Sequence, residues 1–223
     1  VSANSEVPFQ IVLKNGVNYL RIEAAGIPSL GYKVFEIRNG PGSAIFPNAG
    51  TNTGNVVEND FFRITYTNQG VLTSIIDKQN GNRNIAALTN AKYINDLGTG
   101  LANNGTAVVE NNGPVAITIL TTTSAAPLAH STRITLFKNV PRIEIDNQIT
   151  QGFNSITTWS YSFNISSPEV WHEETGAVIK AKLTSNAVNP GNYATQNARY
   201  DWNTLNHFAS VNETNYGVTL SNQ

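Results

Sequence analysis

The chain has 223 residues, a formal net charge of −1 and no cysteine, and its 13% of charged residues is about half the usual share of roughly 25%. The balanced charge leaves no basic stripe, which argues against a nucleic-acid partner, and no apolar run approaches the roughly 18 residues of a membrane span. Without cysteine the chain has neither a disulfide framework nor a thiolate metal site.

The N-terminal part of the chain alternates apolar and polar residues, which is the period of a β-strand. We expect strands at residues 9–14, 18–24 and 32–38. In the first of them Phe9, Ile11 and Leu13 share one side, because successive strand side chains face opposite sides of a sheet. These three side chains are expected to form the apolar face of that strand.

A change of composition follows at residues 39–55, which read NGPGSAIFPNAGTNTGN and are rich in Gly, Pro and Asn. Such a stretch is typical of a linker. The expected organisation is a small β segment with its linker over residues 1–50 and a large β-sandwich domain over residues 51–223.

The rest of the chain keeps the two-residue period. Alternating apolar residues recur at residues 62–66, 115–119, 159–165 and 216–220. Between such runs, Asn15-Gly16, Gln69-Gly70 and Asn80-Gly81 supply the residues that tolerate the positive φ of tight turns. No stretch has a helical period with caps, so the predicted fold class is all-β, an antiparallel β-sandwich.

Histidines and carboxylates are present, but without the spacing of a metal or catalytic motif. None of the three histidines, His130, His172 and His207, lies in an HxD, HxH or HExxH pattern. On a strand His172 and Glu174 would share a face while Glu173 points away. That pair fits an acid–base pair or half of a metal site, and it also fits a plain polar strand end.

Glycoside hydrolysis normally needs two carboxylates that face one cleft. The carboxylates available for such a pair include Asp96, Glu110, Glu144, Asp146 and Asp201. Glu144 and Asp146 share a strand face with Arg142, and a solvated charged face explains them adequately.

Aromatic residues in loop-like stretches suggest sugar binding, because aromatic rings stack on the apolar faces of sugars. The residues concerned are Tyr93, Trp171, Tyr193, Tyr200 and Trp202. The alternative is that these rings close the ends of the sandwich. By themselves, the residues indicate a β-sandwich that is not an enzyme on its own.

One long stretch is similar to a known family. Residues 56–85, VVENDFFRITYTNQGVLTSIIDKQNGNRNI, resemble the start of the large C-terminal β-sandwich of glycoside hydrolase family 38, the α-mannosidases. That family has a strand reading ENxFFRV followed by GxLxSIxDKxxGxE, and Asn84 here replaces the acidic residue that usually comes next. Further similar stretches follow the family's order at residues 26–37, 108–119, 134–149, 170–181 and 207–222.

The resemblance implies a galactose mutarotase-like supersandwich. The family's zinc ligands, nucleophile and acid–base residue belong to an N-terminal α/β domain and a helical domain. The resemblance therefore implies no catalytic residue, metal ligand or cofactor in this chain, and zinc in the catalytic domain that it lacks. It also implies that the chain ends inside the sandwich, since family members continue with more strands.

The sandwich of such enzymes lends side chains to the substrate cleft. The stretch nearest to that region is AKYINDLGTG, residues 91–100, which makes Tyr93, Asn95 and Asp96 the expected substrate-binding residues. The expected partners are an α-mannoside and the catalytic domain of the same parent chain.

The function implied by the resemblance is that of a non-catalytic C-terminal sandwich portion of an α-mannosidase-like, retaining glycoside hydrolase. Alone, this portion is expected to be inactive. One alternative is a free-standing carbohydrate-binding module. Another is a mutarotase-like epimerase that uses His172 or His207 with a carboxylate. The sequence favours no particular compartment.

Overall fold

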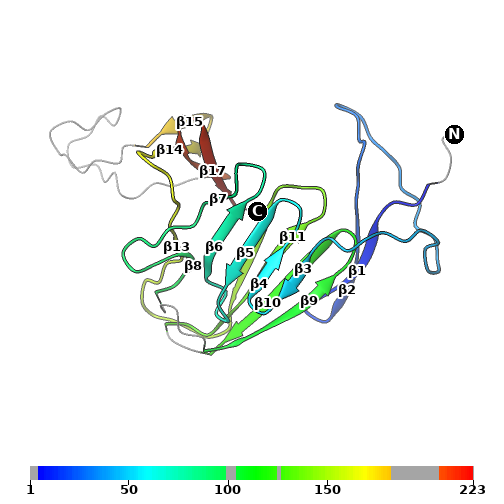
Figure 1. Cartoon of the computed structure of the whole chain (residues 1–223), viewed down its shortest axis with the longest axis horizontal. Coiled ribbons are helices and arrows are strands. Elements are labelled where there is room, and N and C mark those ends of the chain that lie inside the picture. Colours follow the sequence, from blue (N-terminus) through cyan, green and yellow to red (C-terminus); the bar gives the residue numbers. More distant parts are fainter. Residues whose placement is uncertain (1–4, 99–103, 125–126, 182–205, 223) are drawn as a thin grey trace. The chain divides into compact units, whose positions relative to one another are not determined.

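The computed structural model describes residues 5–98, 104–124, 127–181 and 206–222. Its strand pairings in these ranges are antiparallel, and none of the described residues lies in a helix (Figure 1). The predicted all-β, antiparallel class is therefore confirmed. The described part of the chain accordingly contains no helix with the length and hydropathy of a membrane span.

Contacts divide the chain into two units, Val1–Ser162 and Phe163–Gln223. The sequence predicts a boundary near residue 50 instead. The difference arises because the N-terminal hairpin is tied to the sandwich, with the Gln10 side chain hydrogen-bonded to the backbone of Val115 and Ala116. The first 50 residues therefore belong to the same unit as the sandwich.

Two sheets of the first unit form the layers of the sandwich (Figure 1). The larger has the order β13-β8-β6-β5-β4-β3, with β7 beside β6. Its strands are β3 (Thr51–Thr53), β4 (Val56–Glu58), β5 (Phe62–Tyr66), β6 (Leu72–Asp77), β7 (Arg83–Asn84), β8 (Ile94–Asp96) and β13 (Ser160–Tyr161). The smaller has the order β12-β11-β10-β9. Its strands are β9 (Thr106–Asn112), β10 (Ala116–Thr123), β11 (His130–Phe137) and β12 (Ile143–Ile149).

Alternating apolar residues from both layers fill the core. On β5, Phe62, Ile64 and Tyr66 are 8%, 0% and 3% exposed, and on β10 both Ile117 and Ile119 are 0% exposed. Full burial of one such side chain contributes roughly 1.5–3 kcal/mol. These two strands confirm the faces that the sequence predicts for them.

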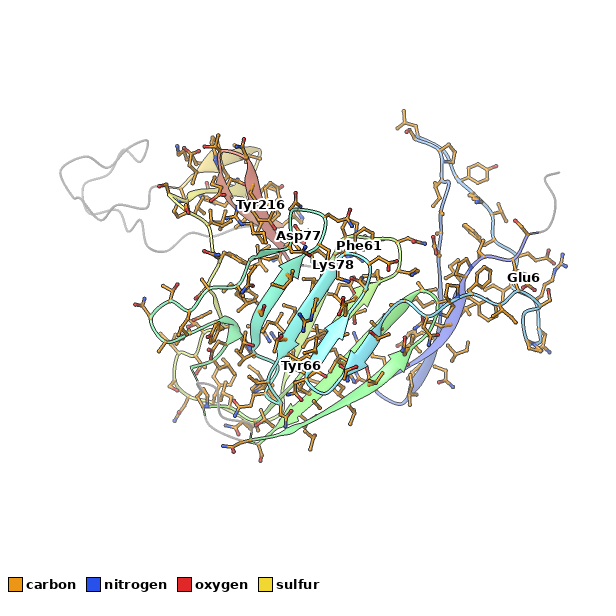
Figure 2. All side chains as sticks on the ribbon, in the orientation of Figure 1. Glu6, Phe61, Tyr66, Asp77, Lys78 and Tyr216 are labelled. Carbon is orange, nitrogen blue, oxygen red and sulfur yellow. The ribbon has the colours of Figure 1, made fainter. Side chains whose placement is uncertain are left out.

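The charged pair Asp77-Lys78 lies where β6 ends, beside the start of β5 (Figure 2). Lys78 Nζ donates a hydrogen bond to the backbone oxygen of Asn59 at 2.6 Å and lies 2.5 Å from Glu58 Oε1. Asp77 Oδ1 accepts a hydrogen bond from the backbone N–H of Gln79 at 3.0 Å. Lys78 therefore ties the end of β6 to the connection between β4 and β5, and Asp77 fixes the turn that follows β6. Both charges have an architectural role.

The N-terminal hairpin of β1 (Phe9–Lys14) and β2 (Val17–Ile22) forms as expected, but its buried face is the opposite of the predicted one. Gln10 and Val12 are only 8% and 6% exposed, whereas Ile11 and Leu13 are 60% and 50% exposed. The prediction that the alternate apolar residues form the buried face is wrong. The polar Gln10 is buried because its amide hydrogen-bonds to the sandwich, which a pattern of hydrophobicity does not reveal.

Two other predicted strands are absent or shorter. Residues 23–50 contain no strand, so the one predicted at residues 32–38 does not form. A strand needs a partner edge for its N–H and C=O groups, and the described part of the chain offers this segment none. The long strand predicted at residues 159–165 is reduced to β13, which pairs with β8 through only two residues and an irregular register.

The second unit contains one four-stranded antiparallel sheet in its described residues, with the order β15-β14-β16-β17. Its strands are β14 (Glu169–Glu174), β15 (Ala177–Lys180), β16 (Phe208–Glu213) and β17 (Tyr216–Ser221). The last strand forms where the sequence predicts one, at residues 216–220, but Leu220 of its predicted apolar face is 38% exposed.

Candidate functional site

A groove lies between hairpin β1–β2 and the neighbouring face of the smaller sheet. It has a volume of about 500 Å³, which is within the range of small-ligand sites. The hairpin supplies one wall, which includes Val12, Tyr19 and Arg21, and the sheet supplies the other.

The hairpin that forms this wall of the groove is held in place by its turn and by hydrogen bonds to the sheet. Asn15 and Gly16 have φ of 53° and 78°, the positive values of a two-residue turn that matches the twist of paired strands. Gln10 Nε2 donates to the oxygen of Ala116 at 3.1 Å, and its Oε1 accepts from the N–H groups of Val115 and Ala116, each at 2.9 Å. Gly113 permits this approach, because a Cβ there would lie 2.7 Å from Gln10 Oε1.

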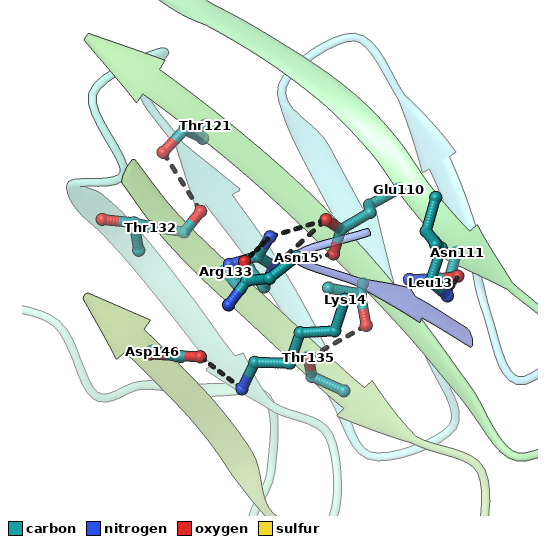
Figure 3. Close-up of polar contacts among 11 residues, drawn as sticks. Leu13, Lys14, Asn15, Glu110, Asn111, Thr121, Thr132, Arg133, Thr135 and Asp146 are labelled. Atoms are coloured by element: carbon teal, nitrogen blue, oxygen red, sulfur yellow. Dashed lines mark hydrogen bonds and ion pairs between the residues drawn. The ribbon is translucent and has the colours of Figure 1, made fainter. Parts of the chain in front are cut away.

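An ion pair at one end of the groove joins β11, β9 and the hairpin turn (Figure 3). Arg133 Nε and Nη2 each lie 2.9 Å from a carboxylate oxygen of Glu110, and Nη2 also donates to Asn15 Oδ1 at 3.3 Å. The two charged side chains are only 12% and 15% exposed. A two-pronged, largely buried pair of this kind fixes both side chains in place.

The remaining charges of the groove come mainly from β12 and the hairpin. Lys14 Nζ lies 2.7 Å from Asp146 Oδ2, and Glu144 accepts a hydrogen bond from Arg142 Nη2 at 2.6 Å. Glu144, Asp146 and Arg142 therefore share a face, as predicted. Along the groove each of these carboxylates already has a cationic partner, so the pairs do not form the free acid and base that glycoside hydrolysis needs.

The floor of the groove is neutral and polar. Thr118 and Thr135 are cross-strand neighbours of β10 and β11, and their hydroxyl oxygens lie 3.0 Å apart. Their exposure is 3% and 5%. The lining as a whole balances three cations with three carboxylates, Lys14, Arg21, Arg133, Glu110, Glu144 and Asp146.

Two of the predicted substrate-binding residues lie inside the sandwich. Asn95 is 1% exposed, and its Nδ2 donates to the oxygen of Gly70 at 3.0 Å and to Asn147 Oδ1 at 3.2 Å. Its Oδ1 accepts from Asn147 Nδ2 at 2.6 Å and from the Tyr161 hydroxyl at 3.2 Å. The positive φ of 57° at this position is one that asparagine tolerates.

Asp96 is 0% exposed, and its carboxylate accepts hydrogen bonds from the backbone N–H groups of Tyr93 at 3.0 Å and Gly98 at 2.7 Å. Tyr93 itself is half-buried beside β8. The structure thus brings Tyr93 and Asp96 together through the backbone and gives Asn95 and Asp96 structural roles. Contact of these three residues with a substrate stays a prediction.

Each histidine named from the sequence has its own neighbours within its unit. His130, in the first unit, has its Nδ1 2.7 Å from the oxygen of Leu128 and its Nε2 3.0 Å from that of Gln69, which ties two loops together. In the second unit His172 Nδ1 lies 3.9 Å from Glu174 Oε1, on the strand face opposite to Glu173.

His207 Nδ1 pairs instead with Glu173 Oε2 at 2.9 Å. The two histidine–carboxylate pairs of this sheet therefore involve opposite faces of β14. Trp171 is also part of β14, whereas Tyr193, Tyr200, Asp201 and Trp202 lie outside the described residues.

No group of three His, Cys, Asp or Glu residues with the geometry of a metal site occurs among the described residues. None of the protein-family models and none of the curated proteins compared with the chain matches it.

The sequence names the three carboxylates of the groove but not the groove itself. Tyr19, Arg21 and Arg133 belong to no recognisable sequence motif. A usable signal is the charged residue at an outward strand position, as at Arg133 between Thr132 and Ile134, combined with a tight hairpin turn.

Proposed function

We propose that the chain is a non-catalytic β-sandwich portion of an α-mannosidase-like glycoside hydrolase. In this role it packs against the catalytic domain of the same parent chain and contributes to the carbohydrate cleft. The ordered resemblance of residues 26–37, 56–85 and the later stretches supports the family, and the all-β antiparallel fold agrees with it.

The observation that carries the proposal is an apolar segment, residues 27–37, that projects its side chains into solvent. Leu30, Tyr32, Val34 and Ile37 are 111%, 85%, 79% and 78% exposed. Large apolar side chains gathered in this way mark a surface that another protein part covers. The segment also has the two-residue period of a strand but pairs with no strand of the described residues, so it is suited to joining the edge of another sheet.

The outer face of the hairpin also exposes apolar side chains. Ile11 and Leu13, with Leu20 opposite Ile11, are 60%, 50% and 39% exposed. A free-standing binding module would not need to expose this much apolar area. A catalytic domain that precedes the sandwich would cover it.

Substitutions in the apolar segment test the proposal. In the full-length product of the reading frame, the double variant Tyr32→Ser, Val34→Ser should lose α-mannosidase activity and roughly 1–3 kcal/mol of docking free energy. In this chain alone it should change the unfolding free energy by no more than about 0.5 kcal/mol, because both side chains are exposed. Val108→Ser is the matched control, since Val108 is a 55%-exposed valine on β9.

Hydrolysis of a chromogenic α-mannoside completes the test. The chain alone should show none, and the full-length product should show zinc-dependent turnover. The proposal fails if the double variant and the Val108→Ser control behave alike in an active full-length protein, or if the chain alone turns over substrate.

The epimerase alternative requires a histidine and a carboxylate that converge in one concave site. The histidine pairs of the second unit involve opposite faces of β14, so no observation favours that function.

A further inference from the structure

We propose that the groove beneath hairpin β1–β2 is a binding site for a neutral saccharide. The site is separate from Tyr93, Asn95 and Asp96, and it does not depend on the proposed role as part of an α-mannosidase. It follows from four properties of the groove: its size, its charge balance, an unused hydrogen-bond donor and an available aromatic ring.

The charge balance selects the class of ligand. Each carboxylate of the lining is already neutralised by a lysine or arginine 2.6–2.9 Å away, so the groove offers no free acid to hold a cation. A neutral ligand that both donates and accepts hydrogen bonds suits such a surface. Hydroxyl groups do both, and a saccharide carries many of them.

Arg21 provides a hydrogen-bond donor that is not used within the described part of the chain. It lines the groove, and its Nη1 is buried with no hydrogen-bond partner among the described residues. The guanidinium is held by stacking against Phe137, with its carbon 5.7 Å from the ring centroid. A buried donor left unpaired is costly, so a shift of the Arg21 side chain that brings Nη1 to a ligand hydroxyl oxygen would relieve that cost.

Tyr19 provides the apolar contact. It is 52% exposed on the hairpin wall, directly across the strand pair from buried Val12. A half-exposed ring beside polar groups is the usual arrangement for stacking on the C–H face of a sugar. The Gln10 and Arg133 hydrogen bonds hold the wall in position before the ligand arrives, which lowers the entropy lost on binding.

The test is a titration of this chain with methyl α-mannoside, followed by NMR of backbone amides and arginine side-chain N–H groups. Saturable shifts should gather at Tyr19, Arg21 and Arg133. Tyr19→Ala should weaken binding roughly threefold to tenfold, as expected for loss of one aromatic contact. Tyr32→Ala is the matched control and should leave binding unchanged, because Tyr32 is exposed elsewhere.

A second variant, Arg21→Lys, keeps the charge but loses the planar fork, and it should also weaken binding. Methyl α-glucoside and inorganic phosphate are titrated in parallel. A neutral sugar of either kind that shifts the groove residues supports the proposal. Saturable phosphate binding in place of sugar binding, shifts confined to Tyr93 and Asn95, or no saturable shift at all would overturn it.

Failure of this experiment leaves the proposed function standing, because docking of the apolar segment is measured in a different protein form and with different variants.

Discussion

Gly70 combines a positive φ with a close approach to the opposite layer of the sandwich. Its φ is +81°, and a Cβ built on it would lie 2.6 Å from Thr132 Cβ and 2.9 Å from Thr121 Oγ1. Both contacts are to the smaller sheet, across the core from the turn that carries Gly70. We therefore predict that Gly70→Ala forces the two layers apart at this point.

The expected cost has two parts. The left-handed backbone costs an alanine roughly 1–2 kcal/mol, and overpacking of a tight contact typically costs about 1–3 kcal/mol. The sum is about 2–5 kcal/mol. At roughly 2–4 °C per kcal/mol for a unit of this size, the melting temperature should fall by about 4–20 °C.

Gly81→Ala is the control for the backbone part. Gly81 also has a positive φ, of +66°, but no atom of the described residues lies within 4 Å of its added Cβ. Differential scanning calorimetry gives the loss of unfolding free energy of the first unit for each variant. The difference between the two losses is the cost of the clash alone. Equal losses of unfolding free energy for both variants would refute the close approach of Gly70 to Thr132.

Three further predictions follow from the same structure. Gln10→Ala removes three hydrogen bonds to the backbone and should lower the free energy that holds the hairpin to the sheet by about 1–3 kcal/mol. Hydrogen exchange should become faster across residues 9–22, with little change in the core. Unchanged exchange would argue against a docked hairpin. The hydrogen bond from Lys138 holds the pKa of Asp60 below its ordinary 3.8, so the pair stabilises the fold above that pH and the contribution is lost as pH falls through the lowered value. Acid unfolding of Asp60→Asn should accordingly be less steep below pH 4, and an unaltered acid limb would contradict the pairing. Burial raises the pKa of the Tyr161 phenol above 10.0, so the stability that the neutral phenol contributes is complete below pH 10 and is lost as pH rises through the raised value. Tyr161→Phe should therefore weaken the dependence of unfolding on alkaline pH. An identical alkaline unfolding curve for the variant would place the phenol in solvent.

Strands of the central core could be predicted from sequence because burial alone decides their faces. Phe62, Ile64 and Tyr66 show this, since each is needed between the two layers. The same rule fails for β1, where the amide of Gln10 replaces missing backbone partners at the end of β10 and thereby turns Ile11 outward. A specific hydrogen bond between distant segments has no signature in a hydrophobic pattern.

The segment at residues 32–38 shows a second limit. Its alternation is that of a strand, but strand formation also requires an edge to pair with, and the sequence of one strand does not tell where that edge is. The candidate groove likewise could not be predicted, because it depends on which segments the fold brings together. Glu144 and Asp146 are recognisable as one charged face, but only the fold brings Tyr19 and Arg21 of the hairpin over it.

The central claim is that the apolar segment at residues 27–37 is covered by a catalytic domain of the same parent chain. Hydrogen exchange followed by mass spectrometry, on this chain and on the full-length product of its reading frame, tests that claim most directly. The account predicts fast exchange of residues 27–37 in the chain alone and at least about 100-fold slower exchange in the full-length protein. Equally fast exchange of this segment in both proteins would contradict it.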